Sequence, residues 1–259
     1  MKVMESDYQG IKEKIVNFIR IKIDEAGSSG AVIGLSGGID SALTAYLAVE
    51  AAGRENVLGI LLPEKGITTK NDIDDAMEIV KILGIDHRII EISKVLSSFS
   101  SIIPDFDKNN ILANGNLKAR TRMCILYYHA NLMHRMVIGT GNRTELLLGY
   151  FTKYGDGGVD IEPIGGLYKT HVRGLARHMG IPEKIIEKVP TAGLWPGQTD
   201  ERELGITYET ADKLLFMLVD EKRDISAVKK IFPPDKVERI TSLLAANAHK
   251  RMPPQSFEI

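Results

Sequence analysis

The sequence is almost free of cysteine: Cys124 is the only one among 259 residues. One cysteine cannot form an internal disulfide, and this chain alone could not supply a cysteine-rich zinc site or hold an iron–sulfur cluster. The chain also lacks an excess of charge, since 33 basic and 34 acidic residues leave a formal net charge of −1. This balance argues against broad nucleic-acid binding, which needs a surplus of lysine and arginine. A local cluster of cations could still hold one small anionic ligand.

Long apolar runs are missing as well. The longest are short, for example residues 57–63, whereas a helix needs roughly 20 apolar residues to span a bilayer. The N-terminus carries a charge every few residues, including Lys2 and Glu5, so it lacks the apolar stretch of a signal peptide. The 26% of charged and 44% of hydrophobic residues are typical of a globular chain. We therefore expect a cytoplasmic protein with one domain over residues 1–259 that binds neither membranes nor nucleic acid.

Strand-like and helix-like segments alternate along the chain. Short apolar runs that end at turn residues predict strands at residues 31–35, 57–62, 87–92 and 136–140. Apolar residues spaced by three and four, with capping residues at the ends, predict helices at 8–23, 41–52, 71–83, 117–133, 168–179, 181–189, 208–221, 225–232 and 235–250. This alternation indicates βαβ units. We therefore expect an α/β fold, doubly wound, with a mainly parallel sheet and helices on both faces. Two polar, glycine-rich stretches, 153–160 and 197–205, are expected to be surface loops or lids.

A glycine turn stands between the first predicted strand and its helix. It reads Ser-Gly-Gly-Ile-Asp-Ser over residues 36–41. Glycines allow a tight turn whose N–H groups face an anion at the positive end of the next helix, and Ser36 and Ser41 add hydroxyl donors. Asp40 would repel a bare phosphate, which indicates a bridging Mg²⁺. The pattern is neither a Walker A loop nor a dinucleotide fingerprint. The plainer interpretation is a strand, a turn and a helix with capping serines.

The string Ser-Gly-Gly-x-Asp-Ser resembles the pyrophosphate loop of the N-type ATP pyrophosphatases. That group includes GMP synthetase, asparagine synthetase, argininosuccinate synthetase, several tRNA-modifying enzymes and NAD synthetase. Its members adenylate an oxygen of the substrate and release pyrophosphate, which is the fragment that such a loop holds. The glycine turn alone does not distinguish among them.

Four later segments make that distinction: Thr-Gly-Asn-Arg-Thr-Glu at 140–145, Phe-Thr-Lys-Tyr-Gly-Asp-Gly-Gly-Val-Asp at 151–160, the long loop 190–205 with Gly-Gln-Thr-Asp-Glu, and Ala-His-Lys-Arg at 248–251. The first follows a predicted strand, so its side chains should lie at the carboxyl edge of the sheet, where open α/β folds bind ligands. Together these segments resemble the NAD synthetase family in its short, ammonia-dependent form. The resemblance runs in order from about Ile11 to Pro254. It implies a Rossmann-like fold of the adenine nucleotide alpha hydrolase type.

The resemblance implies a role for several residues. Those that would cradle the ATP phosphates are Gly34, Leu35, Ser36, Gly37, Gly38, Ile39, Asp40 and Ser41. Asp40 and Glu145 would hold Mg²⁺, for which oxygen ligands are suited. Thr140, Lys169 and Thr191 match positions that touch ATP, with Lys169 as the charge partner of the β- and γ-phosphates.

The resemblance also implies a second substrate site. The positions that line the site for nicotinic acid adenine dinucleotide (deamido-NAD) are Arg120, Lys153, Asp160, His249 and Lys250. Asp156 is expected near the reacting carbonyl, where it would orient ammonia or take its proton; Lys169 and Ser36 complete the candidate catalytic residues. The family forms homodimers. Its glutamine-dependent members carry an extra domain with a cysteine nucleophile, for which the motifs leave no room here, so the expected nitrogen donor is ammonia.

Plainer interpretations stand beside these roles. Asp40 and Glu145 could be solvated carboxylates at helix starts, and His249 a surface histidine. Arg120 and Arg122 lie two apart on a helix and face different sides, so one of them should be a surface or ion-pair residue; only the resemblance favours Arg120 as the ligand. Five residues of the helix predicted at 117–133 are expected to be structural. Cys124 should be a buried hydrophobe, and Tyr127, Tyr128, Leu132 and Met133 should belong to the core or to a subunit interface.

Two other functions remain open, a tRNA-thiolating enzyme and a non-catalytic nucleotide sensor. The first would be expected to bring a cysteine pair or an RNA-binding appendage, which one cysteine and a charge of −1 argue against. The second is disfavoured by Asp40 and Glu145, because carboxylates beside phosphates are unfavourable unless they bind a metal. One departure from the family pattern concerns Gly193, where many members have aspartate, and it affects the expected geometry of that loop.

Overall fold

The computed structural model describes residues 7–257 and is built on a parallel sheet. In these residues the sheet has four strands in the order β3-β2-β1-β4. Their bounds are β1 Ala31–Gly34, β2 Val57–Leu61, β3 Asp86–Ile89 and β4 Met136–Val137. Ala31 of β1 is paired with both Val57 and Met136, so β2 and β4 flank β1. The strand order reverses there, and in doubly wound folds the crevice at the carboxyl ends of such strands binds ligands.

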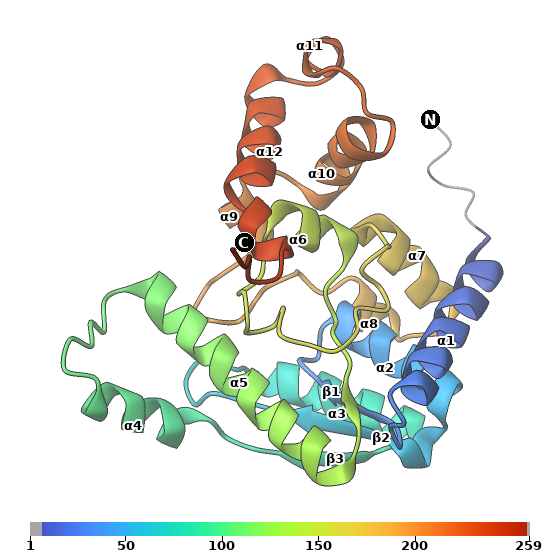
Figure 1. Cartoon of the computed structure of the whole chain (residues 1–259), viewed down its shortest axis with the longest axis vertical. Helices are drawn as coiled ribbons and strands as arrows, with labels where there is room; N and C mark the ends of the chain where they lie inside the picture. The colour runs from blue at the N-terminus through green and yellow to red at the C-terminus, as the bar shows by residue number, and fades with distance from the viewer. Residues whose placement is uncertain (1–6, 258–259) are drawn as a thin grey trace.

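Helices cover both faces of this sheet (Figure 1). Alternate residues of a strand point to opposite faces. On one face Ala31 and Ile33 pack with α1 (Tyr8–Glu25), α2 (Ile39–Ala52), α3 (Lys70–Leu83) and α7 (Lys169–His178). On the other face Val32 and Val137 pack with α4 (Ser93–Ile102) and α5 (Ile111–Met133). Because both faces are buried, the inner strands are almost entirely apolar. The prediction of a doubly wound α/β fold is confirmed.

A C-terminal helical group has its own core, built around Leu148, Tyr208, Leu214 and Val237. Its helices are α6 (Arg143–Leu148), α10 (Tyr208–Leu215), α11 (Ile225–Val228) and α12 (Pro234–Ala246). A π-helical turn, Phe216–Asp220, continues α10, and a 3₁₀ turn, Ala248–Arg251, follows α12. In Figure 1 this group stands above the sheet, beside α7. Short elements complete the chain: η1 (Arg54–Asn56), α8 (Glu183–Ile186) and α9 (Asp200–Leu204).

Several predicted bounds were wrong. The helix expected at 117–133 begins at Ile111, because Asn110 caps it by accepting a bond from the amide of Ala113. The helix expected at 235–250 breaks at Asn247, and the strand expected at 136–140 pairs regularly over only two residues before an isolated bridge from Ile138 to Ile161. The helices α4, α6 and α9 were not predicted. The last two have six and five residues, too few for a helical period to be visible.

The prediction for Cys124 was also wrong, since this residue is exposed on α5. Leu126 and Ala130 of α5 pack toward the sheet, whereas Cys124 shares an outer face with Tyr128 and Leu132, each 66% exposed. Residues four apart lie on one side of a helix, so these three form a single stripe. α5 therefore leaves an apolar face uncovered by the described chain.

No helix within residues 7–257 combines the length and the apolar character that crossing a membrane requires. The charged residues Lys2 and Glu5, on which the argument against a signal peptide rests, lie outside the described residues.

Candidate functional site

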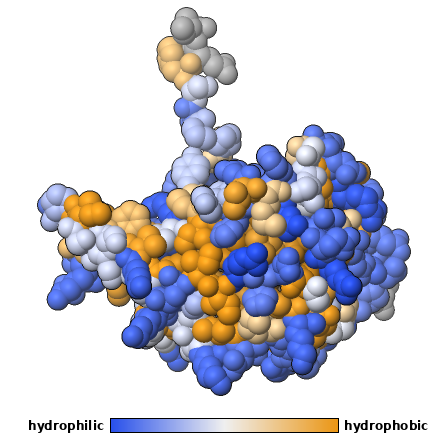
Figure 2. Space-filling view, turned by 90° about the horizontal axis from the view of Figure 1, so that it is seen from below, coloured by the Kyte–Doolittle hydropathy of each residue, from blue (hydrophilic) through white to orange (hydrophobic). Residues whose placement is uncertain are grey.

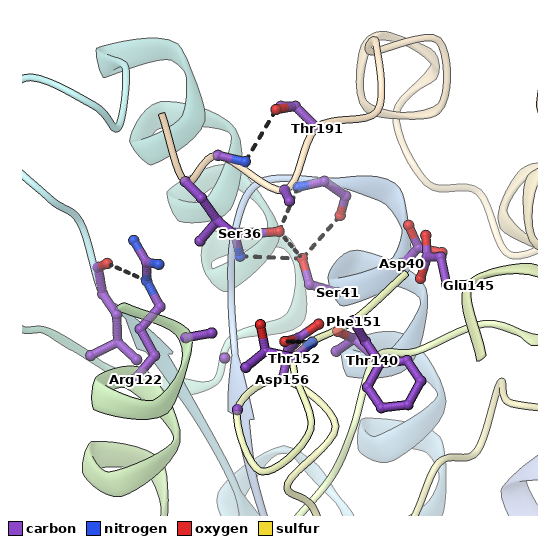
Figure 3. Close-up of a pocket in the computed structure, with 18 of the residues that line it drawn as sticks. Ser36, Asp40, Ser41, Arg122, Thr140, Glu145, Phe151, Thr152, Asp156 and Thr191 are labelled. Carbon is purple, nitrogen blue, oxygen red and sulfur yellow. Dashed lines mark hydrogen bonds between the residues drawn. The ribbon is translucent and has the colours of Figure 1, made fainter. Parts of the chain in front are cut away.

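A cavity of about 460 Å³ opens at the carboxyl edge of the sheet. The glycine turn forms one wall, the end of β2 and α5 another, and residues 149–156 with the loop 188–195 complete it. Figure 3 shows side chains of the glycine turn, of α5, of residues 151–156 and of the loop at Thr191 around the same space. The cavity thus lies at the reversal of strand order, where the fold predicts a ligand.

The glycine turn is shaped by contacts over a few residues. Gly37 has a φ of +77°, and a Cβ there would lie 2.3 Å from the carbonyl oxygen of Asp72, so only glycine fits. Ser41 donates to the carbonyl of Gly38 at 3.0 Å and accepts from the amide of Ser36 at 3.3 Å. Within residues 7–257 no side chain caps α2, whose N-cap is Gly38. The interpretation of the serines as capping residues is therefore wrong, and the start of α2 faces the cavity as an anion site.

A charge cluster lies beside this turn and consists of Asp40, Glu145, Lys169 and Asp200. The ammonium of Lys169 contacts Asp40 Oδ2 at 2.6 Å and Glu145 Oε1 at 3.1 Å, and the Lys169 side chain is 2% exposed. Asp40 lies in the first turn of α2, Glu145 lies in the first turn of α6, and Lys169 is the first residue of α7. Asn142 supports the arrangement by capping α6 and donating to Asp40 Oδ1 at 2.9 Å. Three helix starts therefore converge, which contradicts the interpretation of the two carboxylates as solvated.

The pKa values of the cluster follow from burial and from close charges. Burial raises the pKa of Glu145 to about 7, against the lowering effect of Lys169. Burial alone would lower the pKa of Lys169, but Asp40 and Glu145 outweigh it and raise that pKa. Burial also raises the pKa of Asp200. Three carboxyls surround one ammonium, so the charge balance of the cluster allows a further cation to bind.

The donor set of the cluster fits Mg²⁺. Within residues 7–257 no group of three or more His, Cys, Asp or Glu side chains is arranged to hold a metal by itself. Asp40 and Glu145 supply two carboxylates, both in reach of one ammonium. Mg²⁺ is commonly bound by one or two carboxylates together with substrate phosphates and waters. The cluster next to the glycine turn offers that combination.

Sequence reasoning missed the second layer of the cluster. The hydroxyl of Tyr208 donates to Asp200 Oδ2 at 2.9 Å and lies 3.2 Å from Glu145 Oε1. Tyr150 donates to Glu203 Oε2 at 2.7 Å. Asp200 stands inside the quoted Gly-Gln-Thr-Asp-Glu segment, so the motif was a signal, but the tyrosines are recognised only from the folded contacts.

Asp156 lies in the wall of the cavity opposite the glycine turn (Figure 3). Its Oδ1 accepts a bond from the amide of Thr152 at 2.8 Å. Desolvation by the surrounding cavity wall raises the pKa of Asp156, although the Thr152 amide and the charge of Lys250 act against this. A carboxyl that faces a cavity and has a raised pKa is suited to exchanging a proton with a bound group.

The residues expected to bind deamido-NAD tie α5, residues 149–160 and the C-terminal turn together. Lys153 donates to the carbonyls of His249 and Met252 at 2.8 and 2.9 Å. Lys250 donates to the carbonyls of Gly149 and Phe151 at 2.7 and 2.9 Å.

Among the five expected residues, Lys250 is the one that lines the described cavity. Arg120 lies beside this group and donates to the carbonyl of Lys153 at 3.3 Å. Asp160 accepts from the hydroxyl of Tyr127 at 2.9 Å and from the amide of Val137 at 2.7 Å, so both its oxygens are used within the chain.

Arg122 is a cavity residue that sequence reasoning left unassigned. Its Nε donates to the carbonyl of Leu62 at 3.2 Å, and the guanidinium reaches the cavity from α5 (Figure 3). Burial lowers the pKa of Arg122, whereas Glu64 and Asp156 oppose that shift. The expectation that Arg120 and Arg122 face different sides is met, and the inward one is Arg122.

The loop 188–199 covers the cavity. Thr191 and Thr140 both line it and are labelled near the top and the bottom of the view in Figure 3. Lys118 holds the loop by donating to the carbonyl of Leu194 at 2.8 Å, while Glu64 contacts the same ammonium at 2.8 Å. Trp195 packs over Gly115 of α5. Gly193 has a φ of +61°, a conformation that a side chain disfavours, so the aspartate-to-glycine departure accompanies a left-handed turn.

Comparisons with known proteins identify the family to which the sequence of this chain is similar. The family model described as NAD synthase matches residues 11–254. A protein of Methanococcoides burtonii named NH(3)-dependent NAD(+) synthetase is 53% identical over 94% of this chain and 93% of its own length. A protein of the same name from Methanocaldococcus jannaschii is 47% identical over 96% of both chains.

Two solved structures have a similar fold. NMN synthetase from Francisella tularensis has a TM-score of 0.88 and 35% identity, covering 98% of this chain and all of that one. An NH3-dependent NAD synthetase from Campylobacter jejuni has a TM-score of 0.82 and 34% identity with the same coverage.

Proposed function

This chain belongs to the NAD synthase family, and we propose that it amidates deamido-NAD to NAD with ammonia, consuming ATP and releasing AMP and pyrophosphate. The observation that carries the proposal is the convergence of Asp40, Glu145 and Lys169 beside the glycine turn. This site would hold and neutralise the phosphates of ATP. The family match over nearly the whole chain supports the choice of substrate.

The reaction needs activation because a carboxylate does not accept ammonia directly. Attack of the nicotinate carboxylate on the α-phosphate of ATP forms an acyl-adenylate and releases pyrophosphate. Ammonia then attacks the acyl carbon, and AMP leaves. Two anions must approach each other in the first step, so the main work of the site is to position them and offset their repulsion.

The glycine turn and Lys169 would perform that work on the ATP side. Residues 34–41 would bind the phosphates through the start of α2 and the hydroxyls of Ser36 and Ser41. Lys169 would bind the β- and γ-phosphates, and Thr140 and Thr191, which both line the cavity, would contact ATP. Asp40 and Glu145 would hold Mg²⁺, which when bound would neutralise phosphate oxygens.

The variant Asp40→Asn tests this assignment. It removes one metal-binding charge while keeping the shape, and it should nearly abolish pyrophosphate release, by on the order of 10²–10³-fold. Turnover near that of the unmodified protein would refute the metal role of Asp40.

Asp156 would serve the second step. Its carboxyl lines the cavity and its pKa is raised, which favours uptake of a proton. It would orient ammonia and take the proton that is released when nitrogen bonds to the acyl carbon. Arg120, Lys153, Asp160, His249 and Lys250 would shape the deamido-NAD site, of which Lys250 lies nearest to the reacting groups.

A second copy of the chain would cover the apolar stripe on α5, giving a homodimer. Cys124, Tyr128 and Leu132 share that stripe, and Ile89 of β3 and Ile102 of α4 are exposed as well. Viewed from below, toward β3 and the end of α5, the molecule shows a broad apolar area (Figure 2). Sedimentation should give a dimer that Leu132→Glu dissociates; a monomeric unmodified protein would contradict the proposal.

The deciding assay combines the protein with ATP, Mg²⁺, ammonium and deamido-NAD and measures NAD, AMP and pyrophosphate. Equal amounts of NAD and AMP are expected, with much slower product formation from glutamine. The similarity to a protein named NMN synthetase makes NMN the competing product, so nicotinic acid mononucleotide is tested in parallel. Absence of NAD would overturn the proposal. The cytoplasmic location stays a prediction.

A further inference from the structure

Helix α10 places two polar side chains against the charge cluster from the C-terminal helical group. Tyr208 and Asp212 lie one helical turn apart and are 0% and 3% exposed. Their neighbours Ala211, Leu214 and Leu215 are fully buried in the apolar core of that group. A carboxyl in such a place is unfavourable unless it is hydrogen-bonded, so its bonds show what it is used for.

Both oxygens of Asp212 are used by residues adjacent in sequence to the charge cluster. Oδ1 accepts a bond from the hydroxyl of Thr144 at 2.5 Å, and Oδ2 accepts one from the amide of Thr170 at 2.8 Å. The hydroxyl oxygen of Thr144 in turn accepts a bond from the amide of Lys169 at 3.0 Å. Asp212 is therefore linked to the first two amides of α7, one directly and one through Thr144.

These links connect two helix starts that carry the site. Thr144 precedes Glu145 on α6, and Thr170 follows Lys169 on α7. The first amides of a helix have no acceptor within the helix. The N-cap residue of α7 is Tyr168, and its side chain makes no capping hydrogen bond. Asp212 fills that role from another helix, with the negative charge that a helix start favours.

Tyr208 completes the contact from the same face of α10. Its hydroxyl lies 3.2 Å from Glu145 Oε1, and the Lys169 ammonium sits 4.8 Å from the centre of its ring. Asp212 thus holds the backbone beside Glu145 and Lys169, and Tyr208 contacts the charged ends of these two side chains.

We infer that Asp212 is a positioning residue for the reaction: through Thr144 and the start of α7 it fixes the relative placement of Glu145 and Lys169. This inference rests on the proposed function for its kinetic consequence. It does not require Asp212 to touch a substrate. A displacement of about 1 Å in a site of this kind can lower the rate on the order of 10²-fold.

The test compares variants that differ by one hydrogen-bonding group. Thr144→Val removes the hydroxyl that joins Lys169 to Asp212 and keeps the shape, whereas Thr144→Ser retains the hydroxyl. Asp212→Asn replaces one acceptor by a donor, which cannot satisfy both partners. The control is Thr241→Val on α12, whose hydroxyl bonds only to carbonyls of its own helix, Val237 and Glu238. The thermal unfolding midpoint, kcat and both KM values are measured for each.

Thr144→Val and Asp212→Asn should lower kcat on the order of 10–100-fold, with the KM for deamido-NAD changed by less than about twofold, because that site is built elsewhere. Thr144→Ser and Thr241→Val should keep kcat within about twofold. A folded Thr144→Val with unchanged kcat would overturn the inference, even if Asp212→Asn fails to fold. So would equal losses in Thr144→Ser and Thr144→Val.

A crystal structure of Thr144→Val supplies a readout that does not depend on catalysis. The contacts of Lys169 with Asp40 and Glu145 should lengthen, and unchanged contacts would count against the inference. An unmodified protein that makes no NAD would refute the proposed function, while the displacement in the variant structure would still decide the role of Asp212.

Discussion

The glycine turn and the charge cluster lie side by side and are held in different ways. The turn, residues 36–41, is contiguous in sequence, and its shape depends on serine contacts within the loop and on the packing of Gly37 against α3. The charge cluster brings together four charged side chains from residues 40 to 200, and its supports come from Asn142 before α6 and from α10. A backbone-lined anion site can be encoded locally, whereas a site made of charged side chains needs the whole fold to hold it.

The largest expected effect comes from emptying the cluster of its buried cation. Lys169→Met leaves Asp40 and Glu145 facing each other without compensation, so the unfolding free energy should fall by about 3 kcal/mol and activity by on the order of 10³-fold. The matched change Lys184→Met removes a 57%-exposed ammonium that pairs with Asp75 and Glu78, and it should leave stability nearly unchanged. Urea unfolding measures both. Similar losses of unfolding free energy in the two variants would show that the buried cluster contributes no more to stability than a surface ion pair.

A smaller effect is expected from filling the turn. Gly37→Ala places a methyl group against the Asp72 carbonyl in a left-handed conformation, so stability should fall by about 2 kcal/mol, and ATP binding should be lost. Gly193→Ala is the control, since its φ is similar and nothing lies within 4 Å of an added Cβ; it should lower stability by about 1 kcal/mol. Calorimetric titration with ATP separates the two variants. Normal ATP binding by Gly37→Ala would show that the turn tolerates a side chain.

A third expected effect depends on pH and concerns Glu162, whose carboxyl lies against the backbone of Gly139 and Gly141. Its Oε2 accepts a bond from the Gly141 amide at 2.9 Å, yet burial, with the charges of Asp156 and Glu145, raises the pKa of Glu162 from 4.5 to about 8. A carboxyl with a raised pKa in the folded state favours folding below its unfolded pKa, and this contribution is lost as pH rises from 4.5 to about 8.

The free energy of unfolding of the unmodified protein should therefore decline across that window by several kcal/mol more than that of Glu162→Gln, which has no charge to gain, because each pKa unit between the unfolded and folded values corresponds to about 1.4 kcal/mol. Urea unfolding at several pH values measures the difference. Parallel profiles would mean that Glu162 ionises as freely in the folded chain as in the unfolded one.

The same contrast between a contiguous turn and a cluster of distant side chains explains which site residues could be predicted from the sequence. The glycine turn was recognisable because its residues are adjacent and follow an apolar strand, and Glu145 because it follows the next strand at the same edge. Tyr208 and Asp212 were not recognisable, because a polar residue on an amphipathic helix looks alike whether it meets water or another helix start. Arg122 could be distinguished from Arg120 only once the orientation of α5 was known. The roles of the residues expected to bind deamido-NAD stay predictions.

Trp195 gives the molecule a built-in optical reporter. It is the only tryptophan in the sequence, and it sits in the loop over the cavity, against Gly115 of α5. Excitation at the red edge of protein absorption therefore addresses one indole whose surroundings change whenever that loop moves. The emission of the unmodified chain, recorded during rapid mixing with ATP, follows the loop in real time without any label.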